Sequence, residues 1–329
     1  MSKLSSRKVV SILQILQEHD KPLGSALIAL KLQKFGIDMS ERTVRHYLQQ
    51  MDHDGLTNNF AKRGRMITPK GVNELGSAFV FEEVGLVAAK IDTLTYQMDF
   101  SMQKSVGSII LNLTTFHKQY LYSAFKQIKS VFQAKLGMGR YMTIGYPGTA
   151  IGNIKIDADK VAVGTVCSVT INGILLKKGI YTTSRFGGLL EISKGEPLRF
   201  IEIINYDGTT IDPLEIFIKG GMTSLKNVIL TGNGKIGAGF REFPSIALNK
   251  VEKIKKRLDE IGLGGILMIG RPGQPLLDIP VSKGRTGMIV AGGLNPIAAV
   301  EETGISTENT AMKLFFDFNK MVPYTEIKV

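Results

Sequence analysis

The chain has 329 residues, 43% of them hydrophobic, which excludes an intrinsically disordered protein and suits a small domain joined to a larger one. Its formal net charge of +12 favours an acidic partner, most commonly nucleic acid. The single cysteine, Cys167, excludes an intrachain disulfide framework and fits a reducing cytoplasm, and the absence of a long apolar run or a leader pattern predicts no membrane attachment.

Two stretches near the front of the chain have helical periodicity. The first runs from Arg7 to His19 and the second follows Lys21-Pro22, with Gly36 expected to end it. The apolar positions are Val9, Ile12, Leu13 and Leu16 in the first stretch, and Leu23, Leu27, Leu30, Leu32 and Phe35 in the second. Two short helices are therefore predicted before residue 40.

The stretch from Ser40 to Leu56 predicts a third helix with two different faces. Ser40 is a candidate N-cap, and Gly55 stands where a left-handed residue would end the helix. One face carries the apolar residues Val44, Tyr47, Leu48 and Met51, and the other carries Arg42, Arg45, His46 and Gln49 with no carboxylate among them. Arg and Gln are side chains that read guanine and adenine in a major groove. An ordinary solvated helix face is the alternative interpretation.

A hairpin with a basic tip is predicted between Leu56 and Thr68, where Lys62 and Arg63 precede Gly64 and Arg65. The order of three helices and a basic hairpin resembles a winged helix-turn-helix DNA-binding domain. The alternative is a small helical bundle with a basic hairpin. We assign Ser40, Arg42, Thr43, Arg45, His46 and Gln49 to the DNA groove, and Lys62, Arg63 and Arg65 to the phosphate backbone.

The remaining residues form a larger domain that contains an internal repeat. Helices are predicted at 117–136 and 245–261, each followed by a glycine-rich turn, an apolar strand and a similar loop, Gly145–Gly148 or Gly270–Gly273. Corresponding residues are 125 positions apart, which indicates duplication. The predicted fold class is α+β: a winged helix-turn-helix rich in α-helix at 1–77, and a larger α/β domain at 78–329 with pseudo-repeats at about 80–200 and 201–326.

A ligand site is expected between the two repeats, because clefts between lobes favour ligands. Glycine loops bring backbone N–H groups close to an anion, and arginine pairs with carboxylates. The candidates are Gly145, Tyr146, Gly148, Thr149, Cys167, Arg185, Arg241, Arg271 and Gly273, with Arg285 as a further loop cation. The alternatives are that the glycines only form turns, that most of the arginines are surface residues, and that Cys167 is a small buried hydrophobe.

The sequence contains no pattern typical of an enzyme. It has four histidines, and it has no phosphate-binding Walker loop, no nucleophile elbow and no Cys/His spacing for zinc. We therefore predict no catalytic residues, no metal and no cofactor. A domain that converts a metabolite, fused to a DNA reader, is kept as the alternative function, and an architectural DNA binder is a third.

Several long blocks resemble the effector domain of the archaeal nitrogen repressor family, NrpR. They include IGYPGTAIGNIKIDADKVAVGTVCSVTINGILLKKGI, SRFGGLLEI, FIEIINYDGTTIDPLEIFI, GAGFREFPS and GRPGQPLLDIPV, and the similarity covers nearly all of residues 80–326. The resemblance implies a homodimeric repressor of nitrogen-fixation and nitrogen-assimilation genes that binds a palindromic operator. It implies 2-oxoglutarate as the inducer that weakens DNA binding. It also implies that a companion NrpR-type chain is a further candidate partner.

Overall fold

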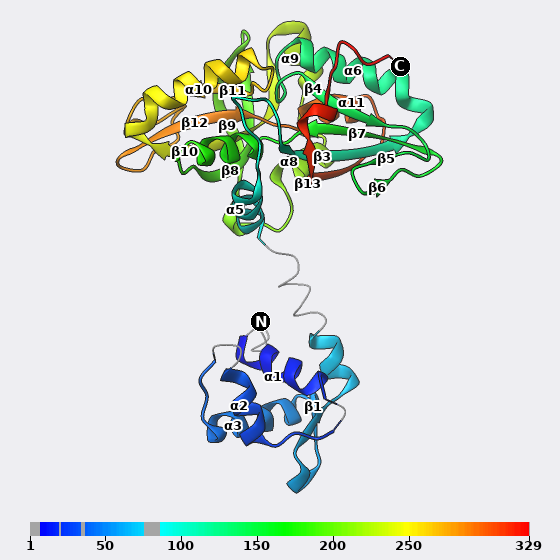
Figure 1. Ribbon diagram of the computed structural model, residues 1–329, viewed down its shortest axis with the longest axis vertical. Helices are drawn as coiled ribbons and strands as arrows, with labels where there is room; N and C mark the ends of the chain where they lie inside the picture. The colour runs from blue at the N-terminus through cyan, green and yellow to red at the C-terminus, as the bar shows by residue number, and fades with distance from the viewer. Residues whose placement is uncertain (1–6, 20, 34–36, 76–85, 329) are drawn as a thin grey trace. The chain divides into compact units, whose positions relative to one another are not determined.

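The chain forms two compact units, Met1–Gly85 and Leu86–Val329, in the computed structural model shown in Figure 1. The structure describes residues 7–19, 21–33, 37–75 and 86–328. The domain boundary predicted near Ser77 lies outside these residues. Each unit has its own hydrophobic core.

Among its described residues, the first unit contains helices α1 to α3, a short hairpin and a further helical segment at 69–75. Its elements are α1 (Arg7–Gln17), α2 (Ser25–Leu32), α3 (Glu41–His53), β1 (Thr57–Asn59), η2 (Ala61–Arg63) and β2 (Arg65–Ile67). The apolar stripes of α1 and α3 meet in one core that includes Ile12, Leu16 and Leu48. The winged-helix prediction is therefore confirmed in its element order.

The predicted apolar stripe of the second helix is confirmed at Leu23 and Leu32 and was wrong at Leu27 and Leu30. Leu27 and Leu30 are 43% and 61% exposed, whereas Ile28 and Leu32 are fully buried. Leu23 precedes the helix and forms an isolated antiparallel bridge with Arg65 of the hairpin. Spacing alone could not separate the two possible faces, because apolar residues occur at most positions of α2. Phe35 and Gly36, expected to close this helix, lie outside the described residues.

The second unit contains α5 (Val87–Gln97), two five-stranded β-sheets, one two-stranded sheet, and the helices between the strands (Figure 1). The elements that follow α5 in its first half are β3 (Ser108–His117), η3 (Lys118–Tyr120), α6 (Leu121–Gln133), β4 (Tyr141–Gly145), β5 (Ala150–Ile151), β6 (Ile154–Lys155), β7 (Lys160–Val166), α7 (Val169–Lys177), β8 (Thr183–Ser193), β9 (Glu196–Asn205) and η4 (Tyr206–Gly208). The later ones are α8 (Pro213–Lys219), α9 (Leu225–Thr231), β10 (Gly234–Pro244), η5 (Ser245–Ala247), α10 (Leu248–Glu260), β11 (Ile266–Ile269), β12 (Arg285–Ala291), α11 (Asn295–Glu301), β13 (Glu308–Asp317), η6 (Phe318–Lys320) and β14 (Val322–Pro323).

The internal repeat is visible in the order of these elements. The segments β3, α6, β4, β7, α7 and β8 correspond in order to β10, α10, β11, β12, α11 and β13. The starts of α6 and α10 are two residues further apart than the starts of β4 and β11, the strands that follow them, because the loop after α6 is longer. Gly262 takes the left-handed conformation after α10, but after α6 that place belongs to Lys135 and not to Gly137.

The two repeats exchange their last strands. One sheet has the order β13-β3-β7-β4-β14 and the other has the order β11-β12-β10-β8-β9. Strand β8 belongs to the first repeat but pairs with β10 of the second, while β13 of the second repeat pairs with β3 of the first. Residues 80–200 and 201–326 therefore do not form two separate lobes, and side chains from both sheets share one continuous core.

Candidate DNA interface and ligand site

Helix α3 presents the predicted groove-reading residues on one exposed surface. The Ser40 side chain caps the helix by accepting a hydrogen bond from the Thr43 N–H, and Val44, Leu48 and Met51 are buried beneath it. Ser40, Arg42, Thr43, Arg45, His46 and Gln49 are all exposed. Gly55 has a φ of +71°, which confirms the predicted end of the helix. Five polar side chains and the cap are therefore available on the outward side of α3.

A carboxylate lies on this surface, contrary to the sequence interpretation. Glu41, the first residue of α3, accepts a hydrogen bond at Oε1 from Nη2 of Arg45 at 2.6 Å. The Ser25 hydroxyl of α2 donates to the same oxygen at 3.0 Å. The pairing was missed because Glu41 was not assigned to the reading face, although residues four apart on a helix are neighbours.

The tip of the hairpin carries two exposed cations instead of three. Lys62 and Arg63 lie on η2 and are exposed, whereas the Arg65 side chain is only 12% exposed. Arg65 donates from Nε to Oδ2 of Asp52 at 2.8 Å, and Thr57 donates to Oδ1 of the same carboxylate. The guanidinium of Arg65 therefore joins β2 to the end of α3, which leaves Arg65 less available to a phosphate backbone than Lys62 and Arg63.

Arg241 of β10 is the least expected charged residue in the second unit. It is 1% exposed, and it donates from Nη2 to the Ser168 hydroxyl at 2.9 Å. Its Nε and Nη1 are buried without a hydrogen-bond partner among the described residues. Burial lowers the pKa of the guanidinium. A buried cation with two unused donors is costly unless an anion completes it.

Polar side chains from several elements surround Arg241. A Cβ atom built at Gly239 would lie 3.3 Å from both Nη1 of Arg241 and the Tyr206 hydroxyl, so these two groups share the space above that glycine. Cys167, next to Ser168, is buried, and burial raises its pKa to about 12. Cys167 is therefore a neutral thiol at physiological pH.

Asp212 adds a titratable carboxylate to this cluster. Burial raises its pKa to about 6, while the hydrogen bond from the Leu214 N–H opposes that shift. Asp212 also interacts electrostatically with Arg241, Tyr206 and Cys167. The charge on Asp212 therefore affects whatever anion approaches the guanidinium.

A cavity of about 310 Å³ lies beside the cluster. It is lined by Ala88, Ile91, Asp92, Tyr181, Thr183, Ser184, Arg185, Asn205 and Asp207. Ser184 is opposite Arg241 in the β8–β10 ladder and accepts a hydrogen bond from Nδ2 of Asn172, whose buried Oδ1 has no partner among the described residues. Helix α5 forms one wall of the cavity through Ala88, Ile91 and Asp92. The cavity therefore meets the Arg241 cluster at Ser184, while Asp92, Asp207 and Arg185 give its lining charges of both signs.

The two glycine loops do not take part in this site. Gly145 pairs with Ala162 near the start of β7, whereas Cys167 follows the end of β7. Gly270 likewise bonds to Gly287 near the start of β12. The far ends of β7 and β12 meet, because a Cβ at Gly293 would lie 3.2 Å from Cα of Cys167. The loops carrying Gly145, Tyr146, Gly148 and Thr149, or Arg271 and Gly273, therefore lie at opposite ends of the unit.

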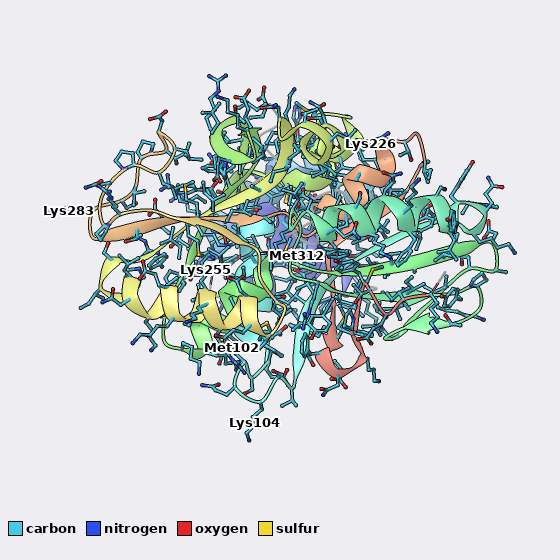
Figure 2. The ribbon with its side chains drawn as sticks, turned by 90° about the horizontal axis from the view of Figure 1, so that it is seen from above. Met102, Lys104, Lys226, Lys255, Lys283 and Met312 are labelled. Carbon is cyan, nitrogen blue, oxygen red and sulfur yellow. The ribbon has the colours of Figure 1, made fainter. Side chains whose placement is uncertain are left out.

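Figure 2 labels one residue near the second glycine loop and one in the interior of the unit. Lys283, between the second glycine loop and β12, is at the outer edge of the view, while Met312 is near its middle. The Met312 N–H donates to Asn112 Oδ1, so Met312 marks the interior near the meeting point of the repeats. The single site predicted from glycine loops and arginines is therefore not brought together, except for Arg241, Cys167 and the neighbouring Arg185.

Arg185 and Arg285 both form ion pairs with one buried carboxylate of the protein itself. Glu242 of β10 is 1% exposed and forms ion pairs with Arg185 of β8 and Arg285 of β12. Arg285 also donates to the backbone carbonyl of Glu242 at 2.6 Å. These contacts tie three neighbouring strands together, so neither arginine is free in the way that Arg241 is.

Several residues of the cluster were missed from sequence. Ser168, Asn172, Ser184, Tyr206 and Asp212 lie on five different loops or elements, and their types carry no spacing signal. Among the described residues no group of three or more His, Cys, Asp or Glu is placed to hold a metal ion. Within that same part of the chain, no helix is long and apolar enough to cross a membrane.

Comparisons with known proteins agree with this architecture. The model of the NrpR regulatory domains NRD1 and 2 matches residues 84–323, and the Ribonuclease R winged-helix domain matches residues 10–75. Global nitrogen regulator NrpRI of Methanosarcina mazei is 33% identical over 96% of this chain and 97% of its own length. Global nitrogen regulator NrpR of Methanococcus maripaludis is 31% identical over 96% of this chain, which spans 55% of that protein.

A solved structure is also similar. A nitrogen repressor-like protein from Methanococcus jannaschii matches 73% of this chain and 99% of its own chain, with a TM-score of 0.62 and 29% sequence identity. Global nitrogen regulator NrpR of Methanocaldococcus jannaschii is 31% identical over 92% of this chain, which spans 52% of that protein. The chain is thus about half the length of two of its three curated relatives.

Proposed function

The chain belongs to the NrpR family of nitrogen regulators, and we propose that this repressor is released from nitrogen-gene operators by 2-oxoglutarate bound at Arg241. Its relatives are named as regulators, and its first unit is a winged-helix DNA-binding domain. The proposal covers the genes of nitrogen fixation and assimilation, a palindromic operator, a homodimer and, as a further partner, a companion NrpR-type chain. It includes no catalytic step and no cofactor, and the cytoplasmic location stays a prediction.

The observation that carries the ligand assignment is the incomplete hydrogen bonding of Arg241. Its Nε and Nη1 are both buried without a partner among the described residues, so the guanidinium still has N–H donors for the oxygens of an anion. A cavity of about 310 Å³, large enough for a small dicarboxylate, is lined by Ser184, the residue opposite Arg241 in the β8–β10 ladder. The Tyr206 hydroxyl, Ser168 and Ser184 offer neutral polar groups around the guanidinium.

Helix α5 connects this site to the DNA-binding unit. It lines the cavity, and it follows residues 76–85, which lead from the first unit. The Val87 N–H donates to the Thr209 carbonyl, and Lys90 Nζ donates to the Ala311 carbonyl in β13. Since α5 is held by the segment after η4 and by β13, a ligand that shifts either segment changes the position of α5. Such a shift releases DNA only to the extent that the ligand binds the released state more tightly.

The test of the proposed function is a mobility-shift assay with the full chain and a nitrogen-gene promoter. We expect 2-oxoglutarate at millimolar concentration to release the protein, with glutarate and pyruvate at equal concentration as controls for the keto group and the second carboxylate. Retention of the complex with 2-oxoglutarate would contradict the inducer assignment. Failure of the ligand-free protein to bind any promoter would contradict the repressor assignment itself.

Ligand affinity is expected to rise as the pH falls from 7.5 to 5.5. The pKa of Asp212 is raised to about 6, so its carboxylate is mostly ionised at pH 7.5 and takes up a proton across this range. Neutralising it removes a negative charge that opposes a bound dianion, an effect worth roughly tenfold in affinity per pKa unit of interaction. The unliganded protein should also become more stable as the pH falls, because the folded state binds the additional proton.

Isothermal titration calorimetry of the full chain at three pH values measures this effect. The matched variant is Asp212→Asn, which keeps an oxygen acceptor for the N-terminus of α8. We expect it to bind 2-oxoglutarate tightly at pH 7.5 and to lose most of the pH dependence. An unchanged slope in Asp212→Asn would show that another group is titrating.

A further inference from the structure

The carboxylate of Glu41 is held in a fixed direction on the outward side of α3. Its Oε1 accepts hydrogen bonds from Arg45 of the same helix and from Ser25 at the start of α2. Its Oε2 has no hydrogen-bond partner among the described residues, and the side chain is 48% exposed. One oxygen is thus used to orient the group, while the other is available to a ligand.

Stabilising the helix does not by itself account for a carboxylate at the exposed position of Glu41. An exposed ion pair such as Glu41–Arg45 contributes little to stability, commonly less than about 1 kcal/mol. A carboxylate on a surface that approaches phosphates also reduces affinity for every duplex, because like charges repel. An acid in the first turn does interact favourably with the helix dipole, but that interaction is independent of DNA sequence.

Only two groups in the major groove can donate a hydrogen bond to a carboxylate. They are the N4 amino group of cytosine and the N6 amino group of adenine. The adenine N6 stands beside the N7 acceptor, which repels a carboxylate, whereas cytosine presents no acceptor on its major-groove edge. Cytosine is therefore the base that suits the free Oε2 of Glu41.

We propose that Glu41 is a base-reading residue that selects cytosine, with the adjacent Arg45 selecting a guanine. The first residues of a recognition helix are the ones that contact base edges in helix-turn-helix proteins, and Glu41 is the first residue of α3. The Ser25 contact keeps the carboxylate extended toward the groove when Arg45 moves to its base. This assignment rests on the proposed DNA binding, and it goes further by naming the bases that α3 selects.

The test is selection of bound duplexes from a random library by the full chain and by Glu41→Gln. The variant keeps one oxygen that can accept hydrogen bonds from Arg45 and Ser25. The other oxygen, the free acceptor, is replaced by an NH₂ group, which is a donor. We expect a cytosine at one position of the wild-type motif and roughly a tenfold loss of that preference in the variant. Binding of the variant to unrelated duplex should stay equal or become tighter, because a negative charge is removed.

Arg63→Ala is the control for a contact that does not read bases. Its guanidinium lies on the exposed tip of the hairpin, so its loss should weaken all duplexes alike and leave the selected motif unchanged. An identical motif from wild type and Glu41→Gln would overturn the assignment of Glu41. A wild-type chain that binds no duplex in the library would instead contradict the proposed function, so the two failures are distinguishable.

Discussion

Arg241→Met is expected to weaken 2-oxoglutarate binding by at least about 100-fold, because a buried charged hydrogen bond of this kind is worth several kcal/mol. The ligand carboxylate would enter a low-dielectric space without its cation, while Ser168 and Tyr206 supply only neutral groups. DNA binding without ligand should be unchanged, since Arg241 belongs to the second unit. The variant should therefore repress in the presence of the inducer.

Calorimetry with 2-oxoglutarate and fluorescence anisotropy with operator DNA together measure this result. Arg271→Met is the matched control, because Arg271 is an exposed arginine in a glycine loop away from the cluster. Thermal unfolding separates a lost contact from a damaged fold: methionine should preserve or raise stability, since two donors of Arg241 are unpaired in the unliganded protein. Release of Arg241→Met from DNA at the wild-type ligand concentration would show that the site lies elsewhere.

Gly64→Ala is expected to disrupt the hairpin of the DNA-binding unit and to abolish tight DNA binding. Gly64 has a φ of +108°, and a Cβ there would lie 2.2 Å from the Leu23 carbonyl oxygen, so backbone has to move. Strain of this kind costs about 3 kcal/mol or more. The movement would break the paired Leu23–Arg65 backbone hydrogen bonds, both 2.9 Å long, that hold the hairpin against the start of α2.

Hydrogen exchange of the Leu23 and Arg65 amides measures the effect directly, and anisotropy measures the loss of DNA affinity. Gly55→Ala is the control for positive φ alone, because its φ is +71° but an added Cβ would touch only the Lys70 side chain, at 3.8 Å. We expect that control to cost about 1 kcal/mol and to keep its hairpin protected. Equal protection in both variants would show that the close approach at Gly64 is not limiting.

The winged-helix unit could be predicted well because its signals are local. Ser40 and Gly55 mark the two ends of α3, and the spacing of Val44, Leu48 and Met51 identifies its buried face. The errors arose where a residue has a partner distant in sequence. Arg65 looked like a free cation of the tip until Asp52 was seen beside it, and Leu27 and Leu30 were exposed by the way α2 meets α1 and α3.

The ligand site was only partly predictable for a related reason. The repeat was evident in the sequence, and it suggested a site made from the repeated glycine loops. The structure places the unpaired arginine at a position that is not repeated: Thr114 of β3 corresponds to Arg241 of β10 and pairs with Asn309 instead. Ser168, Tyr206 and Asp212 approach Arg241 only through the tertiary fold. Predicting the site required knowing that Arg241 is buried. A single sequence does not show this, because it does not show which β-strands lie beside β10 and cover the side chain.

The exchange of β8 and β13 has a consequence for how this unit can be divided. A chain carrying one repeat would lack the strand that lies beside β3 or β10, and it would leave a long unpaired edge. It could fill that gap only by borrowing the strand of another copy, so the duplicated unit is equivalent to a domain-swapped dimer fused end to end. Neither half is then an independent building block, and motion inside the unit has to preserve both borrowed strands.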